Sequence, residues 1–267
     1  MITVAAAQLA LRVGDVTGNR RAGLDAIHGA AERGARLVVL SELSDTGYAF
    51  SDRSEALELA DAESTLEGWT DASAETGVVV VGGFCESDGG SVYNSAAVVD
   101  RTGVRARYRK AHLWDREKEI FTAGHDRPPV IETSIGRLGV MICYDLEFPE
   151  WVRMTSAAGA ELVGVPVNWP TLRRPPGERP IEVVKAQAAA ASYGLNIVVA
   201  DRCNAERDTA WIGGSCIIDS LGYPVAGPVL ADEAQLVIAD VDTVASRDKH
   251  ISKRNHLLTD RRPALYG

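Results

Sequence analysis

The sequence predicts an α/β protein built from two similar halves. Three observations support this prediction. Apolar, strand-like runs follow glycines that end helix-like segments, the segments between these runs have one apolar face, and two short sequences recur in the second half of the chain. Strands that alternate with helices in this way are typical of the α/β class.

Four glycines mark the junctions between helix-like segments and β-rich runs. They are Gly34 before 35–41, Gly77 before 78–82, Gly159 before 160–165 and Gly194 before 195–200. Glycine suits the position after a helix because it adopts φ > 0 without the steric cost of a Cβ. We interpret residues 2–11 as a buried first strand, since this apolar start lacks the basic residues and cleavage site of a signal peptide.

The segments between these runs are expected to form amphipathic helices. The first helix places Leu24, Ile27 and Ala31 on one face. A later helix begins near Pro180, a residue type that suits the first turn of a helix. Its predicted apolar face consists of Ile181, Val184, Ala188 and Ala191.

Two sequence matches relate the halves of the chain. Gly34-Ala-Arg-Leu-Val resembles Gly159-Ala-Glu-Leu-Val, 125 residues later, and Ala97-Val-Val-Asp resembles Cys216-Ile-Ile-Asp, 119 residues later. A pseudo-duplicated α/β sandwich explains both matches. Chance recurrence of a common glycine–strand junction is the alternative at this point.

The chain is predicted to form one domain over 1–267, because no linker rich in Pro, Gly and Ser divides it. The strand pattern stops after Asp242. Residues 247–267 contain six basic and two acidic residues with little apolar periodicity. We predict that 243–267 is a C-terminal tail that docks on a partner subunit; a solvated terminus agrees equally well with its composition.

Composition restricts the possible partners. A formal net charge of −9 disfavours a nucleic-acid partner. The longest stretch without charged residues, 186–200, is too short and too polar to span a membrane. The four cysteines form neither a disulfide framework nor a C-x-x-C metal pair, which favours a reducing cytoplasm.

Cys143 is the candidate nucleophile. Residues 137–142 are predicted to form a buried strand, and the sequence from Cys143 to Trp151 is predicted to form a turn and the start of a helix. A cysteine at such a turn is presented at the carboxyl end of a sheet, beside a helix N-terminus that favours thiolate. A buried structural cysteine is the alternative, and we assign that role to Cys85, Cys203 and Cys216.

Two further polar residues stand in unusual places. Glu42 ends the apolar run 37–41, and a buried carboxylate costs several kcal/mol unless a partner compensates for its charge. Lys110, at the end of a basic run, could be that partner. Taken singly, Glu42 is more often a surface group at a strand end and Lys110 more often part of a solvated basic face, so the prediction depends on their convergence with Cys143.

Taken together, these residues resemble the nitrilase superfamily of carbon–nitrogen hydrolases. Four motifs carry the resemblance, in order along the chain. They are Ser41-Glu42, Tyr108-Arg-Lys110-Ala-His-Leu113, Glu117 ahead of Phe121-Thr-Ala-Gly124, and Gly139-Val-Met-Ile-Cys143-Tyr-Asp-Leu-Glu-Phe-Pro-Glu150. The similarity extends from Met1 to the Arg-Arg-Pro sequence at 261–263.

The resemblance implies a four-layer αββα sandwich and a Glu-Lys-Cys triad. Cys143 would be the nucleophile and Glu42 the general base, while Lys110 and the backbone N–H of Tyr144 would stabilise the oxyanion. Glu117 matches the family's second acidic residue, which orients the lysine; Glu119 is the nearby rival. The family also implies a homodimer or higher homo-oligomer, and no metal or organic cofactor.

The chemistry of these groups agrees with that assignment. A thiol with a pKa near 8.5 costs about 2 kcal/mol to ionise at pH 7, and two nearby carboxylates raise this cost. We therefore expect a protonated thiol whose proton a carboxylate removes as sulfur attacks. A fixed ammonium group would stabilise the oxyanion when it forms.

The predicted reaction is hydrolysis of a small linear amide to a carboxylic acid and ammonia through a thioester. Tyr144 and Asp145 follow the nucleophile where nitrile-hydrolysing members typically have Trp-Glu-Asn. Glu147 stands where several members acting on ω-amides of dicarboxylic acids have arginine, so neutral or amine-bearing amides fit better. The candidate substrate-binding residues are Tyr48, Trp114, Tyr144, Asn168 and Trp169.

Other functions are kept as alternatives. Hydrolysis of an N-carbamoyl amine uses the same chemistry, and nitrile hydrolysis is a weaker alternative. A Cys-His hydrolase would use His112 or His125 as its base. An interaction module without catalysis is disfavoured because all four functional positions have competent side chains. The sequence contains no Gly-x-Ser-x-Gly, His-Glu-x-x-His or phosphate-loop motif.

Overall fold

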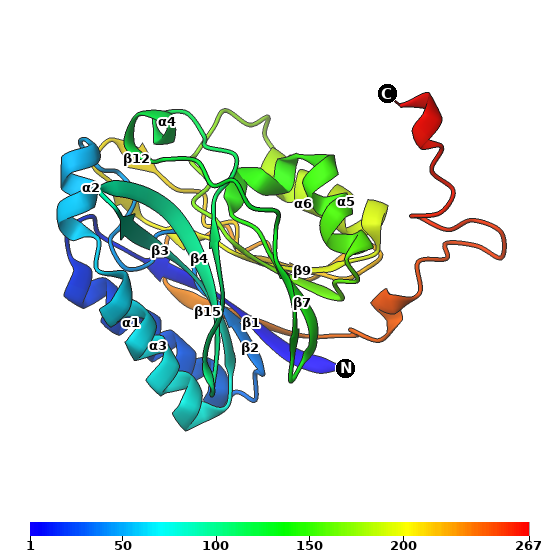
Figure 1. Cartoon of the computed structure of the whole chain (residues 1–267), viewed down its shortest axis with the longest axis horizontal. Helices are drawn as coiled ribbons and strands as arrows, with labels where there is room; N and C mark the ends of the chain where they lie inside the picture. The colour runs from blue at the N-terminus through cyan, green and yellow to red at the C-terminus, as the bar shows by residue number, and fades with distance from the viewer. Residues whose placement is uncertain (267) are drawn as a thin grey trace.

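The computed structural model describes residues 1–266 and consists of two β-sheets packed face to face, with helices on both outer sides (Figure 1). The two sheets and their helices form four layers in the order αββα. This arrangement confirms the predicted sandwich.

The first sheet has the strand order β10-β1-β2-β3-β4-β5, and β15 also pairs with β1. Strands β1, β2 and β3 are parallel, whereas β4 and β5 add antiparallel hairpins. The strands are β1 (Ile2–Ala10), β2 (Leu37–Val39), β3 (Val79–Asp88), β4 (Ser91–Asp100), β5 (Gly103–Arg109), β10 (Arg202–Cys203) and β15 (Gln235–Val241).

The second sheet has the order β14-β13-β9-β8-β7-β6. Strands β7, β8 and β9 are parallel, and β6 and β13 flank them in antiparallel pairings. The strands are β6 (Val130–Thr133), β7 (Gly136–Val140), β8 (Leu162–Pro166), β9 (Asn196–Ala200), β13 (Cys216–Ile218) and β14 (Pro224–Ala226). A small hairpin, β11 (Ala205–Glu206) and β12 (Thr209–Ala210), lies outside both sheets.

The sequence repeats fall on equivalent strands. The first match places Leu37 at the start of β2 and Leu162 at the start of β8, each strand being the middle one of three parallel strands. The second match falls on β4 and β13, which each pair antiparallel with the third parallel strand. The topology therefore supports duplication over chance recurrence.

Alternation along the strands produces three apolar layers. Leu37 and Val39 point toward the other sheet, where they pack in one buried cluster with Leu138 and Leu162. Val38 points the other way and packs with residues of α1 (Val16–Glu32) and α3 (Ala62–Thr76). On the opposite side, α5 (Pro149–Ala157) and α6 (Ile181–Tyr193) cover the second sheet. The short helices α2 (Arg53–Leu59) and α4 (Glu117–Ile120) lie near the ends of the strands (Figure 1).

The four predicted glycine junctions are confirmed. Gly34, Gly77, Gly159 and Gly194 have φ of 79°, 75°, 86° and 61°. Gly77 and Gly194 are the left-handed C-caps of α3 and α6. Each glycine directly precedes the run that contains the next parallel strand of its sheet.

The predicted buried face of the later helix is wrong. Ile181 and Val184 are 53% and 43% exposed, and Ala188 and Ala191 are also exposed. The face of α6 that packs on the sheet contains Val183, Ala186 and Ala190, together with Glu182. The sequence pattern predicted the wrong face because alanine occurs on both faces of α6. In addition, the charged residues Glu182 and Lys185 interrupt the apolar pattern of the buried face.

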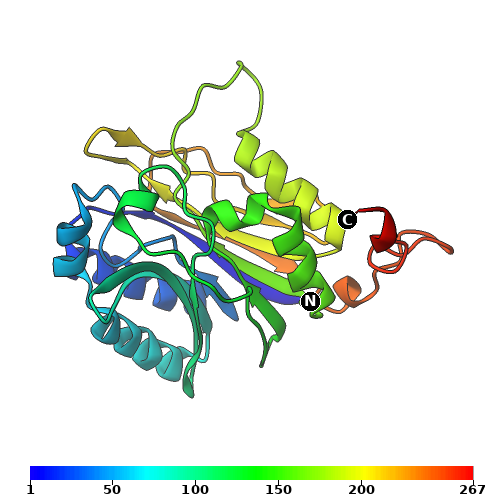
Figure 2. The ribbon, with the colours of Figure 1, turned by 45° about the horizontal axis from the view of Figure 1, so that its top comes forward.

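The C-terminal segment leaves the sandwich after β15. Arg247 and Lys249 anchor its start through Glu161 and the carbonyl of Gly194. Beyond them the chain extends away from the sheets (Figures 1 and 2), and it includes the 3₁₀ turns Ala245–Arg247 and Pro263–Leu265. Gly267, the last residue of the predicted tail, lies outside the described residues. Within residues 1–266, no helix has the length and apolar character needed to cross a membrane.

Candidate active site

Three of the four candidate catalytic residues follow strands at one edge of the sandwich, and the fourth begins a short helix there. Glu42 follows β2, and Lys110 directly follows β5. Strand β5 runs in the same direction as β2 and β3, because two antiparallel pairings, β3 with β4 and β4 with β5, separate it from β3. Cys143 follows β7 in the facing sheet. Glu117 is the first residue of α4.

Two glycines allow these segments to approach each other. A Cβ on Gly83 would lie 2.6 Å from the Cα of Glu42, and a Cβ on Gly124 would lie 2.2 Å from the carbonyl oxygen of Arg109. Both distances are far below van der Waals contact. Gly83 therefore permits the position of Glu42, and Gly124 permits that of the loop that passes Lys110.

Lys110 is fully buried between two carboxylates. Its Nζ lies 2.7 Å from Oε1 of Glu42 and 2.7 Å from Oε1 of Glu117. Glu42 is fully buried and Glu117 is 3% exposed. Because buried charges are costly unless they are paired and hydrogen-bonded, the three groups stabilise one another and have a fixed geometry.

Further donors hold the two carboxylates in place. The side-chain amide of Asn94 donates to Oε1 of Glu42 at 2.7 Å. The Tyr48 hydroxyl donates to Oε1 of Glu117 at 2.7 Å, and the backbone N–H of Trp114 donates to Oε2 of Glu117 at 2.9 Å. Oε2 of Glu42 is buried and has no hydrogen-bond partner among residues 1–266.

Cys143 occupies a strained turn. Its φ of 45° is unusual for a residue other than glycine, as in the sharp strand-to-helix turns that present nucleophiles. The turn is a 3₁₀ helix, Cys143–Glu147, that leads into α5. Buried Asp145 holds the turn by accepting hydrogen bonds from the N–H of Ile142, the Tyr108 hydroxyl and the N–H of His112.

The electrostatic environment keeps the thiol neutral. Burial and the negative charge of Glu42 raise the pKa of Cys143 well above its usual value, against the opposing effect of Lys110. Burial also raises the pKa of Glu42, to about 7, although Lys110 opposes this change. Burial disfavours the charged form of Lys110, but its two carboxylate partners outweigh this effect and raise its pKa. The site thus combines a neutral thiol, a carboxyl group that titrates near neutrality and a permanent ammonium group.

A small cavity of about 130 Å³ opens onto Cys143. All five residues predicted to bind substrate line it: Tyr48, Trp114, Tyr144, Asn168 and Trp169. The side chain of Asn168 donates to the backbone carbonyl of Glu42 at 2.9 Å, and its backbone N–H lowers the pKa of the Cys143 thiol, against the effect of burial. Asn168 therefore connects the nucleophile with the loop that carries Glu42.

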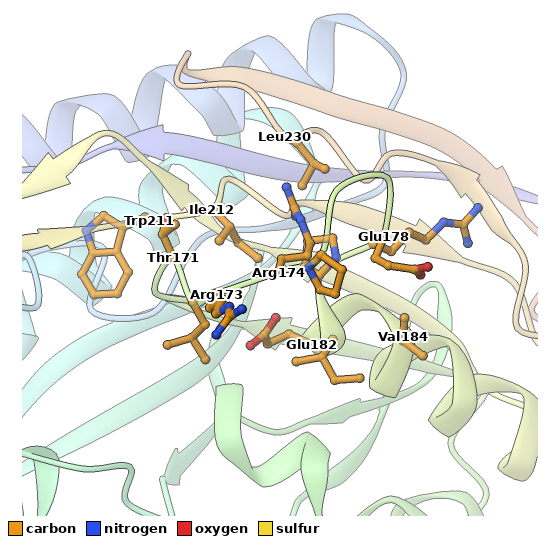
Figure 3. A pocket seen from close by; sticks show the side chains of 14 residues that line it. Thr171, Arg173, Arg174, Glu178, Glu182, Val184, Trp211, Ile212 and Leu230 are labelled. Carbon is orange, nitrogen blue, oxygen red and sulfur yellow. The ribbon is translucent and has the colours of Figure 1, made fainter.

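A larger cavity of about 630 Å³ adjoins the small one and is lined by the loop that leads into α6 (Figure 3). The two cavities share Leu172, Ile181 and Glu182. Glu147, which also lines the inner cavity, forms an ion pair of 2.5 Å with Lys185. Within residues 1–266, no group of three or more His, Cys, Asp or Glu side chains is arranged to hold a metal ion.

The rival candidates lie elsewhere. Glu119 is 74% exposed and faces Arg116, so it does not contact Lys110. His125 is exposed, and Nδ1 of His112 lies 2.7 Å from Oδ1 of Asp145. The other three cysteines are buried in or beside strands.

Sequence reasoning missed several residues of the site. Asn94 was not predicted, although a polar residue inside the apolar strand β4 was a usable signal. Glu182 and Lys185 were also missed, because the predicted orientation of α6 placed them on its outer side. Asp145 was noted only for its contrast with nitrile-hydrolysing members.

The same architecture occurs in amidases of known structure. A glutamate-to-glutamine mutant of the amidase from Nesterenkonia sp. AN1, solved with acrylamide added at its active-site cysteine, matches with a TM-score of 0.82 at 26% identity, over 100% of this chain and 98% of that chain. Fold and site thus define a thiol-containing αββα hydrolase.

Sequence relatives narrow this class. The chain belongs to the carbon–nitrogen hydrolase family, whose model matches residues 3–249. It is 35% identical over 271 residues to a nitrilase from Pyrococcus abyssi, covering 100% of this chain and 99% of the relative. It is 30% identical to an N-carbamoylputrescine amidase from Solanum lycopersicum, over 100% of this chain and 94% of that relative. The protein is therefore a hydrolase that acts on non-peptide C–N bonds of small molecules.

Proposed function

We propose that this protein hydrolyses a small linear aliphatic amide to a carboxylic acid and ammonia. Cys143 is the nucleophile, Glu42 the general base, and Lys110 stabilises the oxyanion together with the backbone N–H of Tyr144. Glu117 orients Lys110 and maintains its charge. The proposal depends chiefly on one observation: Oε2 of Glu42 is buried and free, while Oε1 accepts from Lys110 and Asn94.

The reaction then has two stages. In the first, the thiol proton passes to Oε2 of Glu42 as sulfur bonds to the amide carbon and the oxyanion forms beside Lys110. The C–N bond breaks, the proton moves to the leaving nitrogen and ammonia departs from the thioester. In the second stage, Glu42 takes a proton from water as the oxygen bonds to the thioester carbon. The C–S bond then breaks, and Glu42 returns the proton to the sulfur, which releases the acid and restores the thiol.

Hydrolysis of an N-carbamoyl amine is the second candidate. The same four groups can perform it, and the products then include carbon dioxide as well as ammonia. The relative from Solanum lycopersicum is named an N-carbamoylputrescine amidase, whereas the relative from Nesterenkonia is an amidase. Nitrile hydrolysis is less well supported, despite the name of the Pyrococcus relative, because Tyr144 and Asp145 differ from the Trp-Glu-Asn sequence of such members.

Product analysis tests the proposal. The protein is incubated with aliphatic amides, carbamoyl amines and nitriles, and ammonia, carbon dioxide and the mass of Cys143 are measured. We expect ammonia without carbon dioxide and an acyl adduct on Cys143. Cys143→Ala should abolish both signals, while Cys216→Ala, which changes a buried cysteine of β13, should retain them. Turnover by Cys143→Ala would refute the mechanism.

We also propose a homodimer or higher homo-oligomer in a reducing cytoplasm, with the tail 243–267 docked on the partner. The exposed apolar face of α6 and exposed Ile251, Leu265 and Tyr266 of the tail support this proposal. The four cysteines are free, as a reducing compartment requires. Sedimentation of the full chain should show a dimer or larger species, and deletion of 250–267 should weaken it. A monomer at micromolar concentration would refute this part of the proposal.

A further inference from the structure

Glu182 is a largely buried residue whose carboxylate faces a cavity and has no partner among residues 1–266. The residue is 8% exposed, and its side chain makes no hydrogen bond or ion pair with any group of residues 1–266. A glutamate with so little exposure usually has a cation or a set of donors that compensates for its charge. The residue lies in the first turn of α6, where the helix dipole supplies only a small part of that compensation.

The position of Glu182 connects it to the reaction. It lines the inner cavity together with Cys143, and it also lines the outer cavity (Figure 3). Glu182 thus stands where the two cavities meet. A substrate whose reacting carbon contacts the thiol can extend along the inner cavity toward this carboxylate.

The nearby cations form no ion pair with Glu182. Lys185, one helical turn further along α6, is paired with Glu147. Arg173 and Arg174 line the outer cavity, but no nitrogen of either lies within 4.0 Å of the Glu182 carboxylate. Both arginines are exposed, so water and salt weaken their attraction to Glu182; the Debye length is about 8 Å at physiological ionic strength. A cationic group in direct contact with Glu182 would be screened much less.

On this basis we propose that Glu182 binds a primary ammonium group at the far end of the substrate. The inference rests on the proposed function and refines it: the preferred substrates are linear amides, or carbamoyl amines, that carry a terminal amine. A primary ammonium group fits because it is a compact cation with three N–H donors for the carboxylate of Glu182. Glu182 is then a specificity-determining residue, and its separation from Cys143 selects the chain length.

The test compares two substrates that differ only in charge, hexanamide and 6-aminohexanamide, by ammonia release from the full chain. The wild-type protein should prefer the amino amide in kcat/KM. Glu182→Gln preserves shape and removes the charge, and it should lower this preference about 10- to 100-fold, mainly through KM. Glu178→Gln is the matched control, because Glu178 lines only the outer cavity; it should leave the preference unchanged.

Calorimetry separates this inference from the proposed function. The Cys143→Ala protein should bind 6-aminohexanamide, and the double variant with Glu182→Gln should bind it about 10- to 100-fold more weakly. Such a loss would support the role of Glu182 in binding even if no amide were hydrolysed. The proposed function would then be refuted, while the inference about Glu182 would stand. Equal effects of Glu182→Gln on both amides, or binding that does not depend on Glu182, would overturn the inference.

Discussion

The hydrogen bond from Asn94 to Glu42 should set the pH at which the enzyme becomes active. The Asn94 amide donates at 2.7 Å to the oxygen of Glu42 that also faces Lys110. This bond favours the ionised form of Glu42, against the effect of burial. Asn94→Leu has a similar shape and removes the donor, so the pKa of Glu42 should rise above its value of about 7.

The expected shift follows from the strength of the lost bond. Hydrogen bonds to charged groups contribute about 1.5–3 kcal/mol, and one pKa unit corresponds to about 1.4 kcal/mol, so the pKa of Glu42 should rise by about 1–2 units. The general base acts only when ionised, so activity is lost as pH falls through this pKa. At pH 7, kcat/KM of the variant should therefore decrease about 5- to 50-fold and recover at higher pH.

The assay is the pH profile of kcat/KM for ammonia release. Asn19→Leu is the control, because Asn19 is also buried and hydrogen-bonded but contacts only the backbone of Arg12 and Asp45. The control should lose stability without a change in the acid limb. If Asn94→Leu lowers activity equally at every pH, or its acid limb moves by less than about half a unit, Asn94 does not tune Glu42.

Three further changes test other parts of the structure. Lys110→Met should lower kcat at least about 10²- to 10³-fold in the same assay, and retention of more than a tenth of kcat would argue against an oxyanion role. Gly83→Ala should abolish activity by displacing Glu42, whereas Gly29→Ala, whose Cβ would meet only Leu236 at 3.4 Å, should keep activity; equal activities would contradict the close-approach argument. Glu206→Ala leaves buried Arg202 without its carboxylate, so urea unfolding should show a loss of about 3–5 kcal/mol, and a loss below about 1 kcal/mol would show that the pair is not needed.

Much of the fold could be predicted because its signals are local. A glycine after a helix specifies φ > 0 by itself, so Gly77 and Gly194 identified two helix ends without knowledge of the tertiary structure. The buried face of α6 could not be predicted from such local signals. Which face is buried depends on the sheet beneath it, and a helix that buries Glu182 contradicts the usual separation of polar and apolar residues.

The site shows the same division. Glu42, Lys110 and Cys143 were predictable because each follows a strand at the edge where carboxyl ends of parallel strands gather. Asn94 lies in the middle of β4, and it reaches the site because of the register between β4 and β5, in which the N–H of Lys110 donates to the carbonyl of Asn94 at 2.8 Å. Register depends on pairing across a hairpin, so the sequence could mark Asn94 as an unusual polar residue of this strand but could not place it beside Glu42.

The charges of the site explain why a neutral thiol suits the proposed reaction. In the active form, in which Glu42 is ionised, the two carboxylates and the Lys110 ammonium give the buried cluster one net negative charge, and a thiolate would add a second at high cost. During attack the negative charge leaves Glu42, which becomes protonated, and develops on the oxyanion. In the proposed mechanism, the Glu42 carboxylate and the oxyanion both lie beside Lys110. The ammonium group therefore has a negatively charged partner before and after attack, and the total buried charge stays constant. The arrangement therefore avoids both an unpaired ammonium in the resting enzyme and an unpaired anion in the intermediate, which is the electrostatic condition for a preorganised site.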